Sequence, residues 1–335
     1  MKATTKWIAA GAAVALGLAI SMPSKAADTT VCYAFQDLST GFWVAGHQAI
    51  VSTLEKNGVK VVELNGAHDA NRQLEQVKDC IAQGGAGIIL TADDGDSGTV
   101  VVAAAQEADV PIATFNRPPS DMSKGIVVVA DNEAVARAAV DAMNAEAQKK
   151  FATTGKKLKP LILMGDLADP NAVKRREGFM NSIAKHPELF EKPVEVATKW
   201  NSQTALAGLE AAMTADPEID FIFTSSDFLF PTIQSVLDPL GKWKKAGEPG
   251  HIILGGLDGD DGACKLIGDG FVDSTGVQDV YLEAELALTG ILDAIKASEA
   301  RPNAVKLDPG FALSQANYKE MADKTWGCQV LKSKS

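Results

Sequence analysis

The chain has 335 residues and a formal net charge of −11, and 46% of its residues are hydrophobic although only 6% are aromatic. This composition is too apolar for a disordered chain, and the length suggests roughly two domains. The acidic balance argues against a nucleic-acid partner, because phosphate binding needs a cluster of Lys and Arg that the sequence does not contain.

The first 26 residues have the pattern of a secretory signal peptide. Lys2 and Lys6 form a positive segment, and an uncharged apolar run follows over residues 8–20. Small residues then precede a predicted cleavage site after Ala26. The apolar run is shorter than the ~20 residues that span a bilayer. We therefore expect the mature protein to be exported, most simply to a bacterial periplasm.

Short β-branched runs alternate with amphipathic segments along the rest of the chain. In the first half, the apolar runs predict strands over 31–36, 59–65, 87–91, 111–115 and 126–129. The spacing of apolar residues predicts helices over 41–57, 70–83, 97–108 and 132–150. A polar stretch over 153–159 then separates this half from the next.

The same rhythm restarts after the polar stretch. Strands are predicted over 161–164, 194–198, 219–224, 251–255 and 271–275. Helices are predicted over 171–185, 202–215, 228–237, 262–268 and 280–297. Strands that alternate with helices indicate parallel sheets covered on both faces. The predicted fold class is therefore α/β, with two doubly wound parallel-sheet lobes and a break near residue 130.

Polar and aromatic residues gather where the predicted strands end. In open parallel sheets ligands bind outside these carboxyl ends, so two lobes that face each other through them form a cleft. The first half supplies Gln36, Asp37, Ser39, Thr40, Phe42, Trp43, Asp93, Asp94, Asp96, Asn116, Arg117, Asp131 and Asn132. The second half supplies Arg175, Arg176, Trp200, Asn201, Ser225, Ser226, Asp227, Asp258, Asp260, Gln278 and Asp279.

This mixture of carboxylates, amides, guanidinium groups and aromatic rings suits a neutral, polyhydroxylated ligand. The alternative interpretation is structural. Strand-end residues such as Asp93, Asp96 and Asp227 would then cap the helices that follow them. Trp43 and Trp200 would pack in the core.

No pattern for catalysis, a metal or a cofactor stands out. The histidines have neither triad nor metal spacing, and no glycine-rich nucleotide loop follows the first strand. The segment Asp258-Gly-Asp-Asp-Gly262 lacks the Gly and Glu that a calcium loop needs. We therefore predict no catalytic residue, no metal and no cofactor, although a pair of carboxylates for glycoside hydrolysis stays formally open.

All four cysteines lie beyond the predicted signal peptide, namely Cys32, Cys80, Cys264 and Cys328. An even number of cysteines in an exported chain favours disulfides. Their spacings are too long for a zinc knuckle. The alternative is a set of buried free thiols.

Several short segments carry a family resemblance. They are Ser39-Thr-Gly-Phe-Trp43, Ile112-Ala-Thr-Phe-Asn-Arg117, Val129-Ala-Asp-Asn132, Arg175-Arg-Glu-Gly-Phe179, Phe223-Thr-Ser-Ser-Asp227, Gly256-Leu-Asp-Gly259 and Gly276-Val-Gln278. In this order and spacing they resemble the ribose-binding branch of the periplasmic sugar-binding proteins, the solute receptors of ATP-driven importers. The resemblance covers nearly the whole chain after the predicted signal peptide.

The resemblance implies a type I periplasmic binding protein fold, in which two lobes joined by three crossover segments close around one monosaccharide. The N-terminal lobe would comprise residues 27–130 and about 279–309. The C-terminal lobe would comprise residues 131–278 and about 310–335. The disulfides would then pair within lobes, Cys32 with Cys80 and Cys264 with Cys328.

The resemblance also implies a set of ligand-binding residues. Phe42 and Trp43 would stack on one face of the sugar, and Trp200 would approach from the opposite lobe. Hydroxyl groups would be bound by Gln36, Thr40, Asn116 and Arg117 of the first lobe and by Arg175, Ser226, Asp258 and Gln278 of the second.

Some positions depart from the ribose-receptor pattern. Asn116 stands where Asp is usual, and Ser226 stands where Asn is usual. Gln36 replaces a small Ser, Thr40 replaces Asn, and Val173 occupies a place where the ribose receptor has Arg. A different pentose, a hexose or a sugar alcohol is therefore expected at least as much as ribose.

The resemblance implies a binding protein rather than an enzyme. As a monomer it would capture a small neutral sugar or polyol, deliver it to a membrane permease, and could also present it to a chemoreceptor. One alternative is an exported receptor for a signalling molecule or an amino acid, whose carboxylate and amine Arg117 and Asp258 could hold. An exported carbohydrate-active enzyme is another, and it would turn its sugar over. A repressor of the same fold is excluded, because the signal peptide stands where its DNA-binding segment would be.

Overall fold

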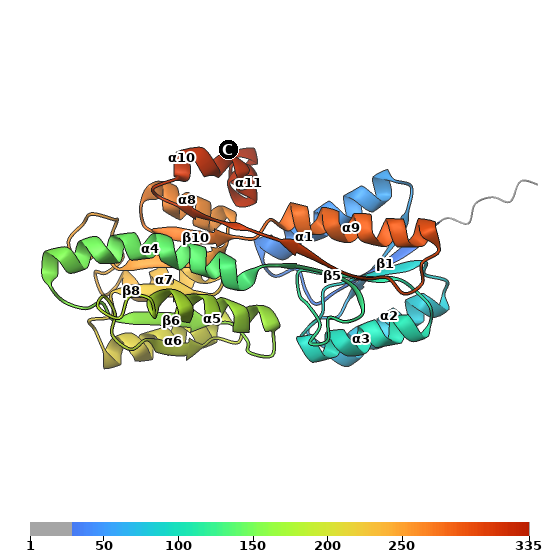
Figure 1. Cartoon of the computed structure of the whole chain (residues 1–335), viewed down its shortest axis with the longest axis horizontal. Coiled ribbons are helices and arrows are strands. Elements are labelled where there is room, and N and C mark those ends of the chain that lie inside the picture. Colours follow the sequence, from blue (N-terminus) through green and yellow to red (C-terminus); the bar gives the residue numbers. More distant parts are fainter. Residues whose placement is uncertain (1–28, 335) are drawn as a thin grey trace, which may run out of the picture.

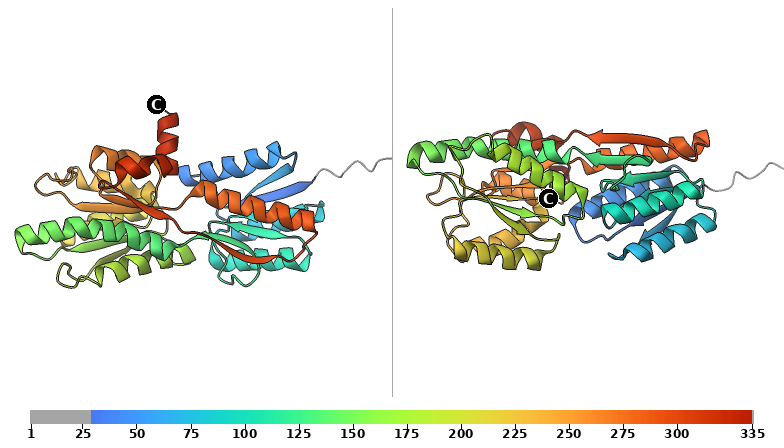
Figure 2. Two further views of the ribbon diagram at one scale, coloured as in Figure 1. Left: turned by 45° about the horizontal axis from the view of Figure 1, so that its top comes forward. Right: turned by 60° about the horizontal axis from the view of Figure 1, so that its bottom comes forward.

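The computed structural model describes residues 29–334 of the chain. The predicted signal peptide, residues 1–26, lies outside these described residues. The described chain forms two α/β lobes that lie side by side, each built on its own six-stranded sheet (Figures 1 and 2). This confirms the predicted fold class of two parallel-sheet lobes.

The first sheet is parallel throughout, with the strand order β11-β5-β4-β3-β1-β2. Its strands are β1 (Thr30–Phe35), β2 (Lys60–Asn65), β3 (Gly87–Leu90), β4 (Ile112–Phe115), β5 (Gly125–Ala130) and β11 (Asn303–Asp308). Helices α1 (Gly41–Lys56) and α9 (Val280–Ala297) cover one face, and α2 (Ala70–Ala82) and α3 (Gly95–Glu107) cover the other (Figure 1). Because both faces are covered, the central strands are apolar runs rather than alternating patterns.

The second sheet has the order β12-β10-β9-β8-β6-β7 and is parallel except for β12, which runs antiparallel to β10. Its strands are β6 (Pro160–Met164), β7 (Val194–Ala197), β8 (Phe221–Thr224), β9 (Ile253–Asp258), β10 (Ser274–Val277) and β12 (Phe311–Ser314). One face packs against α4 (Asn132–Thr154) and α5 (Pro170–Ile183). The other packs against α6 (Ser202–Ala215), α7 (Phe230–Leu237), α8 (Asp261–Asp269) and α11 (Trp326–Ser333). Short helical turns are η1 (Asp227–Leu229), α10 (Tyr318–Met321) and η2 (Ala322–Lys324).

Three segments cross between the lobes, from β5 to α4, from β10 to α9 and from β11 to β12 (Figure 1). Asp308, at the end of β11, fastens them together. Its backbone carbonyl accepts from the Asp131 N–H at 2.8 Å, and its carboxylate accepts from the N–H groups of Asp279 at 2.6 Å and Gly310 at 2.9 Å. Burial raises the pKa of this carboxyl.

Two disulfides are present in the described chain. Cys32 of β1 is bonded to Cys80 of α2, and Cys264 of α8 is bonded to Cys328 of α11. All four cysteines are buried. Each bridge joins elements of one lobe, as the resemblance implied, so neither ties the two lobes to each other.

Two strands of the second sheet differ from their predicted positions. The strand predicted over 251–255 is β9, Ile253–Asp258, and the strand predicted over 271–275 is β10, Ser274–Val277. The predicted strand ends at Gly255, but both Gly255 and Gly256 lie inside β9. A Cβ atom at Gly255 would collide with Met143 of α4, and one at Gly256 would collide with Asp227 and Phe230. These glycines therefore allow close packing within a strand rather than a turn after it.

Candidate ligand-binding cleft

A cavity of about 780 Å³ lies between the lobes and is lined by residues of both. The carboxyl ends of the strands of both sheets open into it, as expected for open parallel sheets. Every predicted ligand-binding residue lines this cavity, namely Gln36, Thr40, Phe42, Trp43, Asn116, Arg117, Arg175, Trp200, Ser226, Asp258 and Gln278. The structure thus brings the predicted set together, and the binding role of each residue stays a prediction.

The first turn of α1 brings two aromatic rings to the cavity. Thr40 is the N-cap of this helix, and its hydroxyl oxygen accepts from the Trp43 N–H at 3.4 Å. Phe42 is buried and packs edge-on against Trp43 and Trp326. Trp43 is only partly buried. Phe42 therefore serves mainly as core, while the Trp43 ring keeps surface available to a ligand.

Arg117 follows β4 and is held in place by several acceptors. Its Nη1 donates to Gln36 Oε1 and, at 2.6 Å, to the carbonyl of Asp93. Its guanidinium carbon lies 5.6 Å from the centroid of the Trp43 ring. Its Nε lies 3.1 Å from Oδ2 of Asp169, which belongs to the other lobe. Gln36 thus supports Arg117 at the cavity wall.

Arg175 and Asp258 form a second buried ion pair, between Nη1 and Oδ1 at 2.9 Å. Asp258 is the last residue of β9 and has a φ of 140°. The Ser226 hydroxyl donates to its other carboxylate oxygen. Burial raises the pKa of Asp258, although Arg175 and Ser226 act in the opposite direction. The Arg175 guanidinium also lies 5.7 Å from the centroid of the Trp200 ring.

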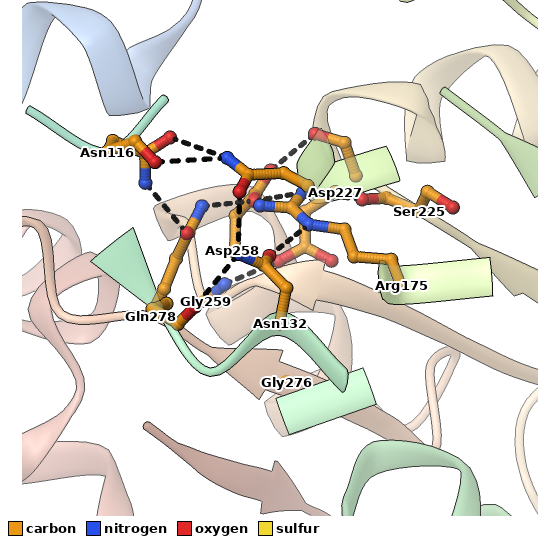
Figure 3. Close-up of polar contacts among 12 residues, drawn as sticks. Asn116, Asn132, Arg175, Ser225, Asp227, Asp258, Gly259, Gly276 and Gln278 are labelled. Carbon is orange, nitrogen blue, oxygen red and sulfur yellow. Dashed lines mark hydrogen bonds and ion pairs between the residues drawn. The ribbon is translucent and has the colours of Figure 1, made fainter. Parts of the chain in front are cut away.

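Buried side chains of the site form a closed ring of hydrogen bonds (Figure 3). In order around the ring they are Asn116, Gln278, Asp258, Arg175, Asn132 and Asn171. Asn116 follows a strand of the first lobe, Asn132 and Gln278 lie at crossing segments, and the others belong to the second lobe. The ring therefore links both lobes and two of the connections between them.

The donor direction is the same in successive steps of this ring. Arg175 Nε donates to Asn132 Oδ1 at 2.6 Å, and Asn132 Nδ2 donates to Asn171 Oδ1 at 3.0 Å. Asn171 Nδ2 donates to the Asn116 backbone carbonyl at 3.1 Å. Guanidinium can only donate, so it fixes which end of each amide faces the next residue.

The ring is completed on the side of Gln278. Asn116 Nδ2 donates to Gln278 Oε1 at 2.9 Å, and Gln278 Nε2 donates to Asp258 Oδ1 at 2.7 Å. The series of hydrogen bonds that starts at Arg175 therefore ends at the Asp258 carboxylate, which only accepts. In the structure, residues predicted to bind hydroxyl groups are therefore bonded to one another.

The helix-cap interpretation of Asp93, Asp96 and Asp227 is wrong. Helix α3 is capped by Asp94, which accepts from the Ser97 N–H at 2.7 Å, while Asp96 accepts from the Ser120 hydroxyl. Asp93 lies 3.1 Å from His68.

Asp227 has a different structural role. Its buried carboxylate accepts from the Gly259 N–H and the Thr275 hydroxyl, each at 2.7 Å. It thus ties the ends of β9 and β10 to the segment after β8. Burial and the nearby Asp260 and Asp258 raise its pKa. Helix α8 is capped by Asp260 and not by Asp258, which lines the cavity instead.

Three buried polar residues at the site were not predicted as site residues: Asp169, Asn171 and Glu283. Asp169 precedes Pro170 at the start of α5, so its sequence signal is that of an ordinary N-cap. Its Oδ2 also accepts from Trp200 Nε1 at 3.2 Å. Glu283 lies in the first turn of α9, where an acidic residue is a common surface feature. Neither Asp169 nor Glu283 carries a local pattern that points to a ligand site.

Within residues 29–334, no group of three or more His, Cys, Asp or Glu side chains is arranged to hold a metal ion. The same part of the chain contains no helix that combines the length and the apolar character needed to cross a membrane.

Comparison with known proteins places these observations in a family. The model of the periplasmic binding protein domain matches residues 31–299. The ribose import binding protein RbsB of Escherichia coli is 24% identical over 266 residues, covering 78% of this chain and 83% of that protein. The D-apiose import binding protein of Actinobacillus succinogenes is 20% identical over 309 residues, covering 92% of this chain and 95% of that protein.

A solved structure shares the fold. The Caulobacter myo-inositol binding protein, bound to myo-inositol, superposes with a TM-score of 0.75 at 20% identity. The match covers 88% of this chain and 96% of that one.

Proposed function

The chain belongs to the periplasmic binding protein domain family, and on this premise we propose that it captures a small neutral sugar or sugar alcohol in the cleft. It then delivers this molecule unchanged to the membrane permease of an ATP-driven importer. Relatives named for ribose and apiose import support the ligand class. The resident residues bind and orient the molecule, and no chemical step on it is proposed.

The charge pairing in the cleft carries the proposal of a neutral ligand. Both guanidinium groups that line the cavity already face carboxylates, Arg117 with Asp169 at 3.1 Å and Arg175 with Asp258 at 2.9 Å. A sugar acid or an amino acid needs an uncompensated cation for its carboxylate. Hydroxyl groups need no cation, because each can donate to one of the hydrogen-bonded side chains of the cleft and accept from another. This pairing disfavours the amino-acid alternative, which relied on Arg117 and Asp258. Lys199 also lines the cavity, but it is exposed to solvent rather than buried against the ligand.

Aromatic surfaces support the same ligand class. Trp43 comes from the first lobe and Trp200 from the second, both line the cavity, and both are partly exposed. A sugar or cyclitol presents C–H groups on its faces and hydroxyl groups around its edge. Its faces can therefore lie on the indole rings, while the hydroxyl groups at its edge contact the hydrogen-bonded side chains.

We also propose the cellular setting. Residues 1–26 direct export, and the mature protein acts as a monomer in the periplasm. The lobes comprise 27–130 with about 279–309 and 131–278 with about 310–335, and they move about the crossing segments that Asp308 fastens. The ligand-bound protein could also bind a chemoreceptor.

A thermal-shift screen tests the proposed ligand class. The neutral panel contains D-ribose, L-arabinose, D-allose, D-galactose, myo-inositol and glycerol, and the charged panel contains D-galacturonate and the common amino acids. A neutral compound at 100 times its Kd should stabilise the protein by ~2.7 kcal/mol, and chromatography should recover it unchanged. Stabilisation by charged compounds alone, or turnover of a neutral one, would overturn the proposal.

A further inference from the structure

Glu283 is a buried carboxyl group directly behind the cavity wall. It lies in the first turn of α9, is 0% exposed, and does not line the cavity. Its Oε2 accepts from Asn116 Nδ2 at 2.9 Å, and its Oε1 has no hydrogen-bond partner among residues 29–334. The contact with Asn116 is therefore its one direct link to the ligand site.

The side-chain amide of Asn116 has no donor left for a ligand. An amide nitrogen carries two hydrogens, and Nδ2 donates to Gln278 Oε1 and to Glu283 Oε2, both at 2.9 Å. The amide oxygen has one long contact, 3.4 Å from Asn171 Nδ2. Asn116 can thus offer a ligand an acceptor and nothing else.

A reversed Asn116 amide would fail at both contacts. Its oxygen would then face Gln278 Oε1, which is fixed as an acceptor because Gln278 Nε2 donates to Asp258. It would also face Oε2 of Glu283. Burial raises the pKa of this carboxyl, and because Oε2 accepts from Asn116 its proton belongs on Oε1, which leaves Oε2 an acceptor. Two acceptors therefore select one orientation, and Glu283 is the one that lies outside the hydrogen-bonded ring.

We propose that Glu283 is a positioning residue for the ligand, which holds the Asn116 amide so that its oxygen accepts from one ligand hydroxyl group. This inference rests on the proposed function, because it assigns the direction of one hydrogen bond in the same cleft. It predicts that a ligand must donate a hydrogen at this point. A derivative with that hydroxyl methylated loses the bond.

Two substitutions of Glu283 separate positioning from packing. Glu283→Gln keeps a carbonyl acceptor for Asn116, whereas Glu283→Met fills similar space without one. With the neutral panel compound that binds the unmodified protein most tightly, calorimetry should show less than a threefold loss for Glu283→Gln. The loss for Glu283→Met should be at least tenfold. Equal affinities for the two variants would overturn the proposal.

Stability of the ligand-free protein provides the control for these variants. Glu283→Met leaves one Asn116 Nδ2 hydrogen without an acceptor, and Glu283→Gln leaves its own amide nitrogen without one, so the two variants should have similar melting temperatures. A loss of affinity that accompanies a loss of stability would indicate a packing role and would overturn the proposal.

A second pair of variants tests the contact without any ligand. Asn116→Asp places a carboxylate against the carboxyl group of Glu283, so one proton must be retained between them. Burial already raises the pKa of Glu283 in the unmodified protein, and a carboxylate at position 116 raises it further. The folded Asn116→Asp variant therefore holds this proton to a higher pH than the unmodified protein does, and its stability falls over a wider range of rising pH. In the Glu283→Gln background the new amide can donate to the Asp, so Asn116→Asp should produce no such change there.

The other charged groups near Glu283 are Asp308, Asp279 and Arg175. They are present in every variant, so each melting profile is compared with that of the unmodified protein. An equal effect of Asn116→Asp on the pH profile of the unmodified protein and on that of Glu283→Gln would overturn the proposal. This stability measurement needs no sugar. It therefore tests the contact between Glu283 and Asn116 even if no panel compound binds and the proposed function itself fails.

Discussion

Asp169 Oδ2 lies 3.1 Å from Arg117 Nε, although the two residues belong to different lobes. Both side chains are buried, and the same carboxylate oxygen accepts from Trp200 Nε1 at 3.2 Å. One carboxyl group thus connects the guanidinium of the first lobe with an indole of the second. It compensates a charge that would otherwise attract anions into the cleft.

Asp169→Asn should therefore change ligand selectivity. The Asn side chain can still cap α5, but it leaves the buried Arg117 without a counter-charge, which costs ~3 kcal/mol of stability. Calorimetry with D-galactose and D-galacturonate should show the affinity ratio moving toward the acid. An unchanged ratio would mean that Asp169 does not set the charge of the site.

Asp258→Ala should weaken binding of the tightest neutral compound by at least ~100-fold, because charge-assisted hydrogen bonds contribute ~1.5–3 kcal/mol each. The ligand-free protein should also lose stability, because Arg175 loses its buried partner. Asp260→Ala is the matched control. It removes the cap of α8, so it should cost ~1 kcal/mol of stability and leave affinity unchanged.

Trp200→Ala should weaken sugar binding by at least ~10-fold if the ring covers one face of the ligand. Trp200→Phe keeps an aromatic face but loses the N–H that bonds to Asp169, so the two variants separate the two contributions. Trp243, which stacks on Phe271 away from the cavity lining, is the control, and Trp243→Ala should leave affinity unchanged. Full affinity of Trp200→Ala would assign this ring to structural packing.

His251 should make stability depend on pH. Burial lowers the pKa of His251, but the hydrogen bond and the charge of Asp273 and the carbonyl of Lys244 raise it by more, so the net shift is upward. Its contribution is fully present below the unfolded pKa of about 6.5 and is lost as the pH rises through the folded pKa. Urea titrations from pH 6 to 9 should show the stability advantage over His251→Gln shrinking. A constant advantage would contradict the charged pair.

Removing the Cys32–Cys80 bridge should cost ~2–5 kcal/mol of stability. Neither cysteine lines the cavity, so the double Cys→Ser variant should keep its affinity at temperatures where it is folded. A non-reducing peptide map of the unmodified protein should show the two within-lobe pairs. A bridge between Cys32 and either cysteine of the second lobe would contradict the structure.

Local patterns were sufficient for most of the fold. The periodic spacing of apolar residues placed α6 and α9 over the same residues as the structure does. The C-terminal strands β11 and β12 were not predicted from the pattern. Strand β11 is an edge strand whose side chains are mostly exposed, so it has no continuous apolar run. It becomes a strand because β5 offers it a row of hydrogen-bonding partners.

The sequence likewise predicted some residues of the candidate site and missed others. The polar and aromatic residues after each strand could be predicted, because parallel strands deliver their carboxyl ends to one edge. Asp169 and Glu283 could not, since one has the local signal of a helix cap and the other that of an exposed first-turn acid. Their roles depend on Arg117 and Asn116, which are distant in the sequence.

The sequence by itself determined the alternation of strands and helices, and hence a cleft lined with hydroxyl-binding groups. It does so because apolar periodicity and strand-end chemistry are local properties of the chain. Only the tertiary structure decided which charges compensate one another and which way the amides of the ring point. Those properties depend on distances of about 3 Å between side chains from different lobes, and only packing fixes such distances.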